Sequence, residues 1–122
     1  MKSTMKDFVV EPEHTALAIG SGGLEVLSTP SLIAYMENVC FEWLQTQLLP
    51  GYSSVGIQMD MKHLQPTGVS EKVTISIEVV EKNEQKVIFN CLATQGDKTI
   101  GTAVHKRFIV ETKQFLNKIN TL

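Results

Sequence analysis

The sequence predicts an α+β fold in which a curved antiparallel sheet of about five strands wraps around one long central helix. Two patterns predict this arrangement. One segment, from Thr29 to about Leu48, carries helix signals and is apolar on nearly all sides, and the segments after it alternate apolar and polar residues as strands do. In so short a chain, a sheet can cover such a helix only by curling around it.

The length and composition indicate one domain spanning residues 1–122. Hydrophobic residues make up 43% of the chain and charged residues 20%, which is ordinary for a globular protein. The net charge of -2 and the lack of a Lys/Arg block argue against a nucleic-acid or anionic-membrane partner. Because the first residues lack the apolar core of a signal peptide and no apolar run could span a bilayer, we expect a cytoplasmic protein.

The predicted helix has well-marked ends. Thr29 is predicted as the N-cap and Pro30 as the first helical residue, and Pro50 and Gly51 stop the helix. The apolar residues of this segment cover almost the whole circumference: Leu32, Ile33, Ala34, Tyr35, Met36, Val39, Cys40, Phe41, Trp43 and Leu44. We therefore expect the helix to be buried on most sides.

Glu37 interrupts this apolar surface. Its neighbours one helical turn away are Ile33 and Ala34 on one side and Cys40 and Phe41 on the other. A charge in such surroundings must be paired or functional. Desolvation would raise the pKa of its carboxyl and a nearby imidazolium would lower it, which makes Glu37 a candidate base or nucleophile. The alternative is a structural glutamate that is capped by a buried partner or reaches solvent at an interface.

Four segments after the helix are predicted to form strands. The first, residues 55–63, alternates strictly and places one set of side chains on a common face: Val55, Ile57, Met59, Met61 and His63. The others span residues 69–80, 85–95 and 98–111. Before the helix, residues 8–10 and 15–19 are expected to supply a short additional strand. Short turns between successive strands predict antiparallel pairing.

A sheet of this kind leaves one edge strand unpaired. Pairing that edge with a second copy of the chain would satisfy its backbone hydrogen-bonding groups and join two sheets across a twofold axis. We therefore expect a homodimer, with a dimer of dimers as a further possibility.

The cysteines and histidines do not form a metal-binding pattern. Cys40 in the helix and Cys91 in a strand are far apart in sequence, as expected of reduced core residues rather than of a disulfide framework or zinc site. The spacings of His14, His63 and His105 match no recognised ligand pattern. We therefore expect no metal ion.

Arg107 shares one face of the last predicted strand with His105, Gly101 and Ala103. The two small residues leave space beside the sheet, where a phosphate or an acyl carbonyl could lie against the arginine. The alternative is a charge at a solvated edge. For Arg107 the pattern fits a substrate contact and a solvated charge equally well. For His105 the solvated charge is the favoured interpretation.

Thr29, Glu37 and His63 together supply a hydroxyl, a carboxylate and an imidazole, which suffice for acyl transfer. A helix rises about 1.5 Å per residue, so Thr29 and Glu37 lie roughly 12 Å apart along the axis and cannot touch. Two arrangements remain open: His63 lies between them, or Thr29 of one subunit faces Glu37 of the other. A purely structural histidine at position 63 is the alternative to catalysis.

Four segments resemble a known family in their order and spacing. They are FVVEPEH at residues 8–14, STPSLIAYME at 28–37, GIQMDMKHLQPT at 56–67 and GTAVHKR at 101–107. Over nearly its whole length the chain is similar to hotdog-fold acyl-CoA thioesterases, in particular to the fluoroacetyl-CoA thioesterase-like group. The resemblance implies the hotdog fold and an acyl-CoA substrate, with no cofactor other than the CoA carried by that substrate.

By this resemblance, the family's catalytic threonine, glutamate and histidine fall on Thr29, Glu37 and His63, while Gly56 and Arg107 match positions that contact the substrate. The loop before the helix is short and glycine-rich, and it carries no aromatic residue that could close over a small acyl group. The resemblance therefore does not imply specificity for fluoroacetyl-CoA.

The leading hypothesis is an acyl-CoA thioesterase that releases a free acid and CoA. Glu37 and His63 would handle protons or water, and Thr29 would engage the reacting carbonyl. The alternative is a non-catalytic dimer of the same fold that binds or senses acyl-CoA. The sequence leaves open the acyl group, the choice between CoA and an acyl-carrier protein, and the pathway.

Overall fold

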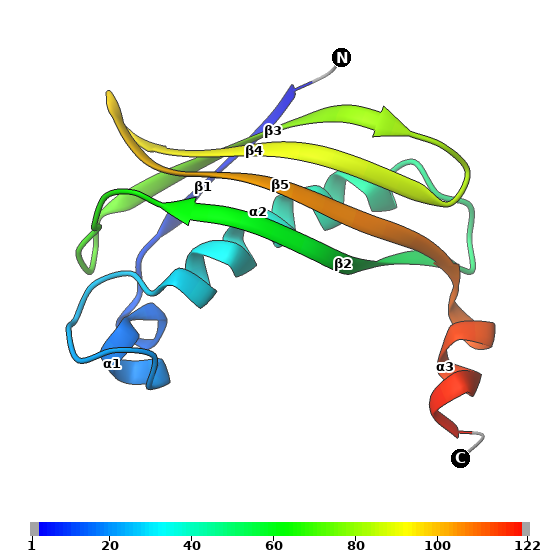
Figure 1. Ribbon diagram of the computed structural model, residues 1–122, viewed down its shortest axis with the longest axis horizontal. Coiled ribbons are helices and arrows are strands. Elements are labelled where there is room, and N and C mark those ends of the chain that lie inside the picture. Colours follow the sequence, from blue (N-terminus) through cyan, green and yellow to red (C-terminus); the bar gives the residue numbers. More distant parts are fainter. Residues whose placement is uncertain (1–2, 121–122) are drawn as a thin grey trace.

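One long helix lies against the inner face of a five-stranded antiparallel sheet (Figure 1), in a computed structural model that describes residues 3–120. The helix, α2, spans Thr29–Gln45. The strands are β1 (Ser3–Val9), β2 (Tyr52–His63), β3 (Lys72–Lys82), β4 (Lys86–Gln95) and β5 (Lys98–Glu111). Their order in the sheet is β1-β3-β4-β5-β2. The predicted α+β architecture is therefore confirmed.

The core lies between α2 and the middle of the sheet. The alternation predicted for two strands is observed, because their inward residues are buried: Val73, Ile75, Ile77 and Val79 on β3, and Val87, Phe89, Cys91 and Ala93 on β4. They form one cluster with the buried side of α2, including Leu32, Met36 and Val39. Burying one such side chain contributes about 1.5–3 kcal/mol, so this cluster fixes the helix against the sheet.

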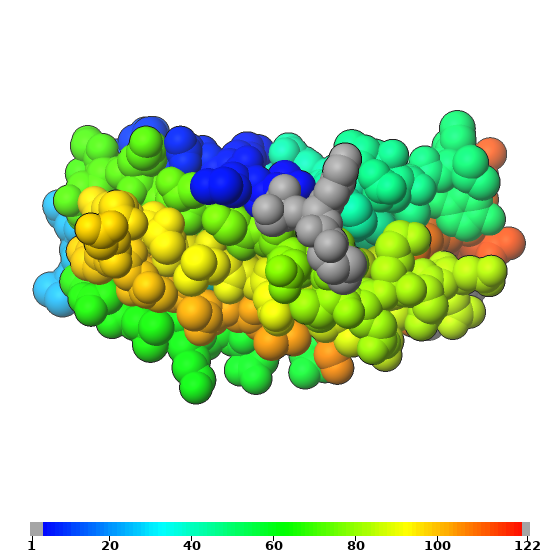
Figure 2. All heavy atoms as spheres, turned by 90° about the horizontal axis from the view of Figure 1, so that it is seen from above, coloured from blue at the N-terminus to red at the C-terminus, as the bar shows by residue number. Residues whose placement is uncertain are grey.

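Strand β2 forms a free edge of the sheet. Figure 2 shows the strands from the face away from α2, with β2 in green along the edge opposite β1 in blue. Apolar side chains are exposed on this strand, and Ile57 is 52% exposed. An edge of this kind presents unpaired backbone groups to a second chain.

The strict alternation predicted for residues 55–63 is wrong, because β2 contains a bulge. Its register against β5 shifts between Gly56 and Gln58, where one extra residue enters the strand. Met59 and His63 still face inward, opposite buried residues of β5, whereas Val55 and Ile57 do not share their face. The bulge reverses the phase of the strand, and alternation in the sequence carries no signal for it.

The start of α2 differs from the prediction by one residue. Ser28, not Thr29, is the N-cap, because the backbone N–H of Ser31 donates to Ser28 Oγ at 3.1 Å. Thr29 is the first helical residue, and its hydroxyl caps no amide. The helix ends at Gln45, three residues before the predicted Leu48.

The segment before α2 also differs from the prediction. Residues 15–19 form no strand, because Thr15 caps a short helix, α1 (Ala16–Ile19), by accepting from the N–H of Ala18 at 3.2 Å. A 3-10 turn, η1 (Pro12–His14), precedes it, and β1 is longer than the predicted residues 8–10. A last helix, α3 (Thr112–Asn120), follows β5. No helix within residues 3–120 is long and apolar enough to cross a membrane.

We predict that Ser28→Ala lowers the free energy of unfolding by about 1 kcal/mol, because the N–H of Ser31 then loses its acceptor. Thr29→Ala should change that free energy by less than about 0.5 kcal/mol, since the Thr29 hydroxyl caps no amide. Urea unfolding of both variants measures the difference. A larger loss for Thr29→Ala than for Ser28→Ala would place the cap at Thr29.

Candidate functional site

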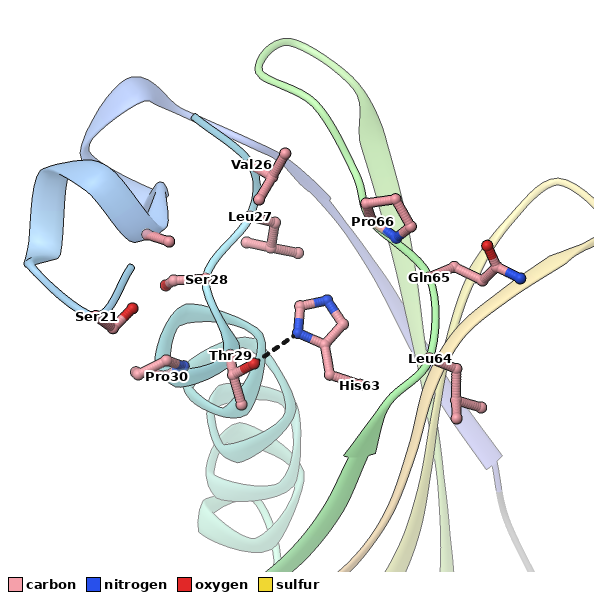
Figure 3. Close-up of a pocket in the computed structure, with 11 residues that line it drawn as sticks. Ser21, Val26, Leu27, Ser28, Thr29, Pro30, His63, Leu64, Gln65 and Pro66 are labelled. Carbon is pink, nitrogen blue, oxygen red and sulfur yellow. Dashed lines mark hydrogen bonds between the residues drawn. The ribbon is translucent and has the colours of Figure 1, made fainter. Parts of the chain in front are cut away.

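Thr29 and His63 meet at one end of the molecule. Thr29 lies in the first turn of α2 and His63 is the last residue of β2, and Thr29 Oγ1 lies 2.8 Å from His63 Nδ1 (Figure 3). Both residues line a pocket of about 380 Å³ together with residues of the glycine-rich loop and of the turn after β2. Because Ser28 provides the cap, the Thr29 hydroxyl is available for this contact.

The imidazole of His63 is held in its neutral form. Burial lowers its pKa below the usual value, and the nearby backbone of Gln65 opposes this effect only in part. Its second nitrogen, Nε2, is buried and has no hydrogen-bond partner within residues 3–120. At neutral pH the ring can therefore accept a proton through Nδ1, from the side where the Thr29 hydroxyl lies.

The start of α2 offers few amides to a ligand. Pro30 has no N–H, and the N–H of Ser31 is bonded to Ser28. The backbone N–H of Thr29 is therefore the candidate donor for an oxyanion at this end of the helix, where the helix dipole also favours negative charge.

A second polar cluster lies further along α2 and β2. Glu37 is half-buried, and its carboxylate approaches the backbone of Gly56 closely. A Cβ added at Gly56 would lie 2.7 Å from Glu37 Oε2 and 3.4 Å from Arg107 Nη1. Any larger side chain at position 56 would have to displace the carboxylate. Three residues expected from the family resemblance, Glu37, Gly56 and Arg107, therefore meet at one point.

Arg107 is buried and bonded to Ser54. It is 6% exposed, its Nε donates to Ser54 Oγ at 2.8 Å, and its Nη2 donates to the Ser54 carbonyl at 3.0 Å. The ring of Phe41 lies beneath the guanidinium, 5.6 Å from centroid to Cζ. The alternative of a solvated edge charge is therefore wrong for Arg107, because β5 lies between β4 and β2 and not at the edge.

The favoured interpretation of His105, a charge at a solvated edge, is wrong. It is 0% exposed, its Nδ1–H donates to the carbonyl of Gln58 at 2.9 Å, and its Nε2 lies 3.2 Å from Arg107 Nη1. The sequence did show that His105 shares a face with Arg107, because the two residues are two positions apart on the same predicted strand. Ser54, the other partner of Arg107, was missed, because nothing in the sequence distinguishes it from an ordinary strand serine.

Glu37 opposes the effect of burial on its two basic neighbours. Burial lowers the pKa of His105 and that of Arg107, and the negative charge of Glu37 raises both. For His105, the bond to the Gln58 backbone also raises the pKa, whereas the charge of Arg107 lowers it. The guanidinium remains charged, since its ordinary pKa is far above neutral pH. The imidazole of His105 is neutral, because one nitrogen donates to a carbonyl and the other accepts from the guanidinium.

The two clusters are separate within one chain. Thr29 and Glu37 are eight residues apart on α2, which corresponds to roughly 12 Å along the helix. His63 and Gly56 are seven residues apart on β2, or roughly 20 Å along the strand. His63 bonds to Thr29 and lies opposite Gly101, so within one chain it does not bridge Thr29 and Glu37.

The remaining histidine and the cysteines have structural surroundings. His14 Nδ1 accepts from the N–H of Glu11 at 3.1 Å and lies 2.7 Å from the hydroxyl of Tyr35. Cys40 and Cys91 are free and buried, with their Sγ atoms 3.7 Å apart. The neighbouring thiol and burial raise the pKa of Cys40, so it stays protonated. Within residues 3–120 no group of three His, Cys, Asp or Glu side chains could hold a metal ion.

Comparison with known proteins places this chain in a family. A family model described as fluoroacetyl-CoA-specific thioesterase (FlK) matches residues 10–113. The fluoroacetyl-CoA thioesterase of Streptantibioticus cattleyicolor is 25% identical over 119 residues, which cover 93% of this chain and 86% of that protein.

Solved structures confirm the hotdog fold. A structure of the fluoroacetyl-CoA thioesterase FlK matches with a TM-score of 0.92 and 24% identity, covering 98% of this chain and 93% of that one. A hot-dog-like protein from Thermanaerovibrio acidaminovorans matches with a TM-score of 0.88 and 20% identity, covering 97% and 87%. Since the family model spans most of the sequence, this chain belongs to the family of fluoroacetyl-CoA-specific thioesterases.

Proposed function

We propose that the protein hydrolyses an acyl-CoA thioester to a free acid and CoA. The observation that carries this proposal is the hydrogen bond between Thr29 and His63 in a pocket, in a chain that belongs to a thioesterase family. A mutant of FlK has been solved in complex with fluoroacetate and CoA, which supports CoA as the carrier. The loop before α2 carries no aromatic residue. We therefore propose that the enzyme accepts a broader range of acyl groups than fluoroacetyl alone.

In the proposed reaction, His63 takes a proton from the oxygen that attacks the thioester carbonyl. That oxygen belongs to Thr29 or to a water molecule held beside it. The backbone N–H of Thr29 donates to the oxyanion that develops on the carbonyl. When the carbon–sulfur bond breaks, the imidazolium of His63 returns the proton to the departing thiolate of CoA. Where Thr29 is the attacking group, a water molecule deprotonated by His63 then cleaves the acyl-threonine ester, which releases the acid and restores the hydroxyl.

We further propose that Glu37 of the partner subunit completes this site in a homodimer. Antiparallel pairing of β2 with its copy, centred on Asp60, aligns His63 of one chain with Gly56 of the other, because the extra residue of the bulge lies between Gly56 and that centre and has no partner in the pairing. Gly56 lies against Glu37 and Arg107. The free edge of β2 and the separation of the two clusters within one chain support this arrangement.

The first prediction from this proposed reaction concerns single substitutions. Thr29→Ala, His63→Ala and Glu37→Gln should each lower kcat by about 100- to 10,000-fold, because each removes a group that handles a proton or the carbonyl. Release of free thiol from short, medium and aromatic acyl-CoAs measures this. Lys62→Ala, an exposed residue beside His63, is the control and should leave kcat unchanged.

Two outcomes would contradict this assignment. Turnover that is unchanged in the Glu37 and His63 variants would remove them from the reaction. Acyl-CoA binding in calorimetry without thiol release from any substrate would instead establish the non-catalytic binding dimer.

The second prediction tests the shared site. A heterodimer of one Thr29→Ala chain and one Glu37→Gln chain, purified through two different tags, contains one intact site and should show about half of the wild-type rate. A heterodimer of Thr29→Ala and His63→Ala chains is the matched control, because both changes fall in the same half-site, and it should stay inactive. Recovery in neither heterodimer would mean that each chain carries its own complete site.

The third prediction concerns pH. His63 accepts a proton only when neutral, and burial keeps its pKa below the ordinary 6.5. As the pH falls through this lowered pKa the ring becomes protonated, so kcat/KM should decrease with a midpoint below pH 6.5. Measurement from about pH 4.5 to 8 tests this, with His63→Gln as the control that should lose this limb. A flat profile, or the same limb in the control, would argue against proton transfer by His63.

A further inference from the structure

The hydrogen bonds of Arg107 to Ser54 and His105 do not use all of its N–H groups, and one of the unused groups lies on the side of Gly56. An arginine carries five N–H groups, and three of them are used: two on Ser54 and one on Nε2 of His105. The other two have no protein acceptor within residues 3–120. Nη1, which carries one of them, is the guanidinium atom nearest to the space above Gly56, where Glu37 also points.

His105 can hold Arg107 only in one tautomer. Its Nδ1 faces the carbonyl of Gln58, which can only accept, so Nδ1 carries the proton. Nε2 therefore presents a lone pair to Nη1 of Arg107. The ring is further fixed by stacking on Phe89, with centroids 6.3 Å apart and planes inclined by 25°. Both the orientation and the protonation of the ring are thus set by its surroundings.

We propose that His105 is a positioning residue for the acyl-binding part of the site: its Nε2 holds the guanidinium of Arg107 so that the free Nη1–H points above Gly56 toward an electron-rich atom of the acyl group. Without this bond, fewer contacts resist rotation of the guanidinium about its Nε–Cζ bond, the rotation that moves Nη1 away from Gly56. Arg107 would remain bonded to Ser54 through Nε, so the fold would persist while Nη1 and its free N–H lost their position. This inference rests on the proposed function and assigns a role to a residue outside the proposed catalytic set.

Two amide substitutions separate positioning from packing. In His105→Asn the side-chain amide reaches the place of Nδ1 and keeps the bond to Gln58, but no acceptor reaches Arg107. In His105→Gln the amide reaches the place of Nε2 and its oxygen can accept from Arg107. Both lose the stacking on Phe89, so they are matched for that loss.

The kinetic test uses the acyl-CoA that the wild type hydrolyses fastest. His105→Asn should lower kcat/KM roughly tenfold, as expected for loss of a hydrogen bond to a charged group, and His105→Gln should retain most of it. In an Arg107→Gln background His105→Asn should have no further effect, because the group it positions is gone. Equal losses in the two amide variants, or an undiminished effect in that background, would overturn the proposal.

A spectroscopic test does not depend on activity. Arg107 is the only arginine in the sequence, so its guanidinium signals in a ¹⁵N-labelled sample need no assignment. Separate Nη signals, which report slow rotation about the Nε–Cζ bond, should be present in the wild type and in His105→Gln and should merge in His105→Asn. If His105→Asn fails to fold, His105→Phe keeps the ring on Phe89 and takes its place.

The two tests also distinguish the two proposals. If the wild type releases no thiol from any acyl-CoA, the proposed function has failed, and the Nη signals alone decide on His105. Signals that stay separate in His105→Asn would overturn the positioning role whether or not the enzyme is active.

Discussion

The bulge in β2 is the constraint on which both polar clusters depend. Gly56 and His63 are seven residues apart, an odd number, so an uninterrupted strand would turn them to opposite faces of the sheet. The extra residue between Gly56 and Gln58 restores a common face, and both residues point toward α2. The carbonyl of Gln58, at the bulge itself, then accepts from His105. Because of this one inserted residue, the same strand places His63 beside Thr29 and Gly56 beside Glu37.

The separate roles of Ser28 and Thr29 at the start of α2 also determine which hydroxyl meets His63. A side-chain oxygen at the N-terminus stabilises a helix, and a threonine used for that purpose has its side chain turned toward the amide that it caps. Ser28 takes this task, buried and bonded to the N–H of Ser31. Thr29 is thereby left exposed on the first turn, bonded only through its hydroxyl to His63. The two adjacent hydroxyl residues serve stability and reactivity separately.

The parts of the fold that follow from local periodicity could be predicted, and the parts that depend on tertiary contacts could not. The buried faces of β3 and β4 and the extent of α2 to within three residues were visible in the spacing of apolar residues. The bulge in β2 was not, because an extra residue leaves no trace in composition. His105 was misjudged for the same kind of reason: whether β5 lies at an edge or in the interior depends on where β2 pairs, which is about 50 residues away in sequence.

The single arginine of the chain belongs to the site and also contributes to the fold, because its burial requires bonds to the neighbouring strand β2. A buried charge is costly unless it is paired and hydrogen-bonded. Arg107 meets this condition with the nearby carboxylate of Glu37, the ring of Phe41 and the bonds to Ser54 and His105. A lysine could not replace it, because only the planar fork reaches the hydroxyl and the carbonyl of Ser54 together. These bonds join β5 to the free edge strand close to the bulge, where the register of the two strands shifts. The group that faces the proposed acyl pocket therefore also holds the free edge strand in place.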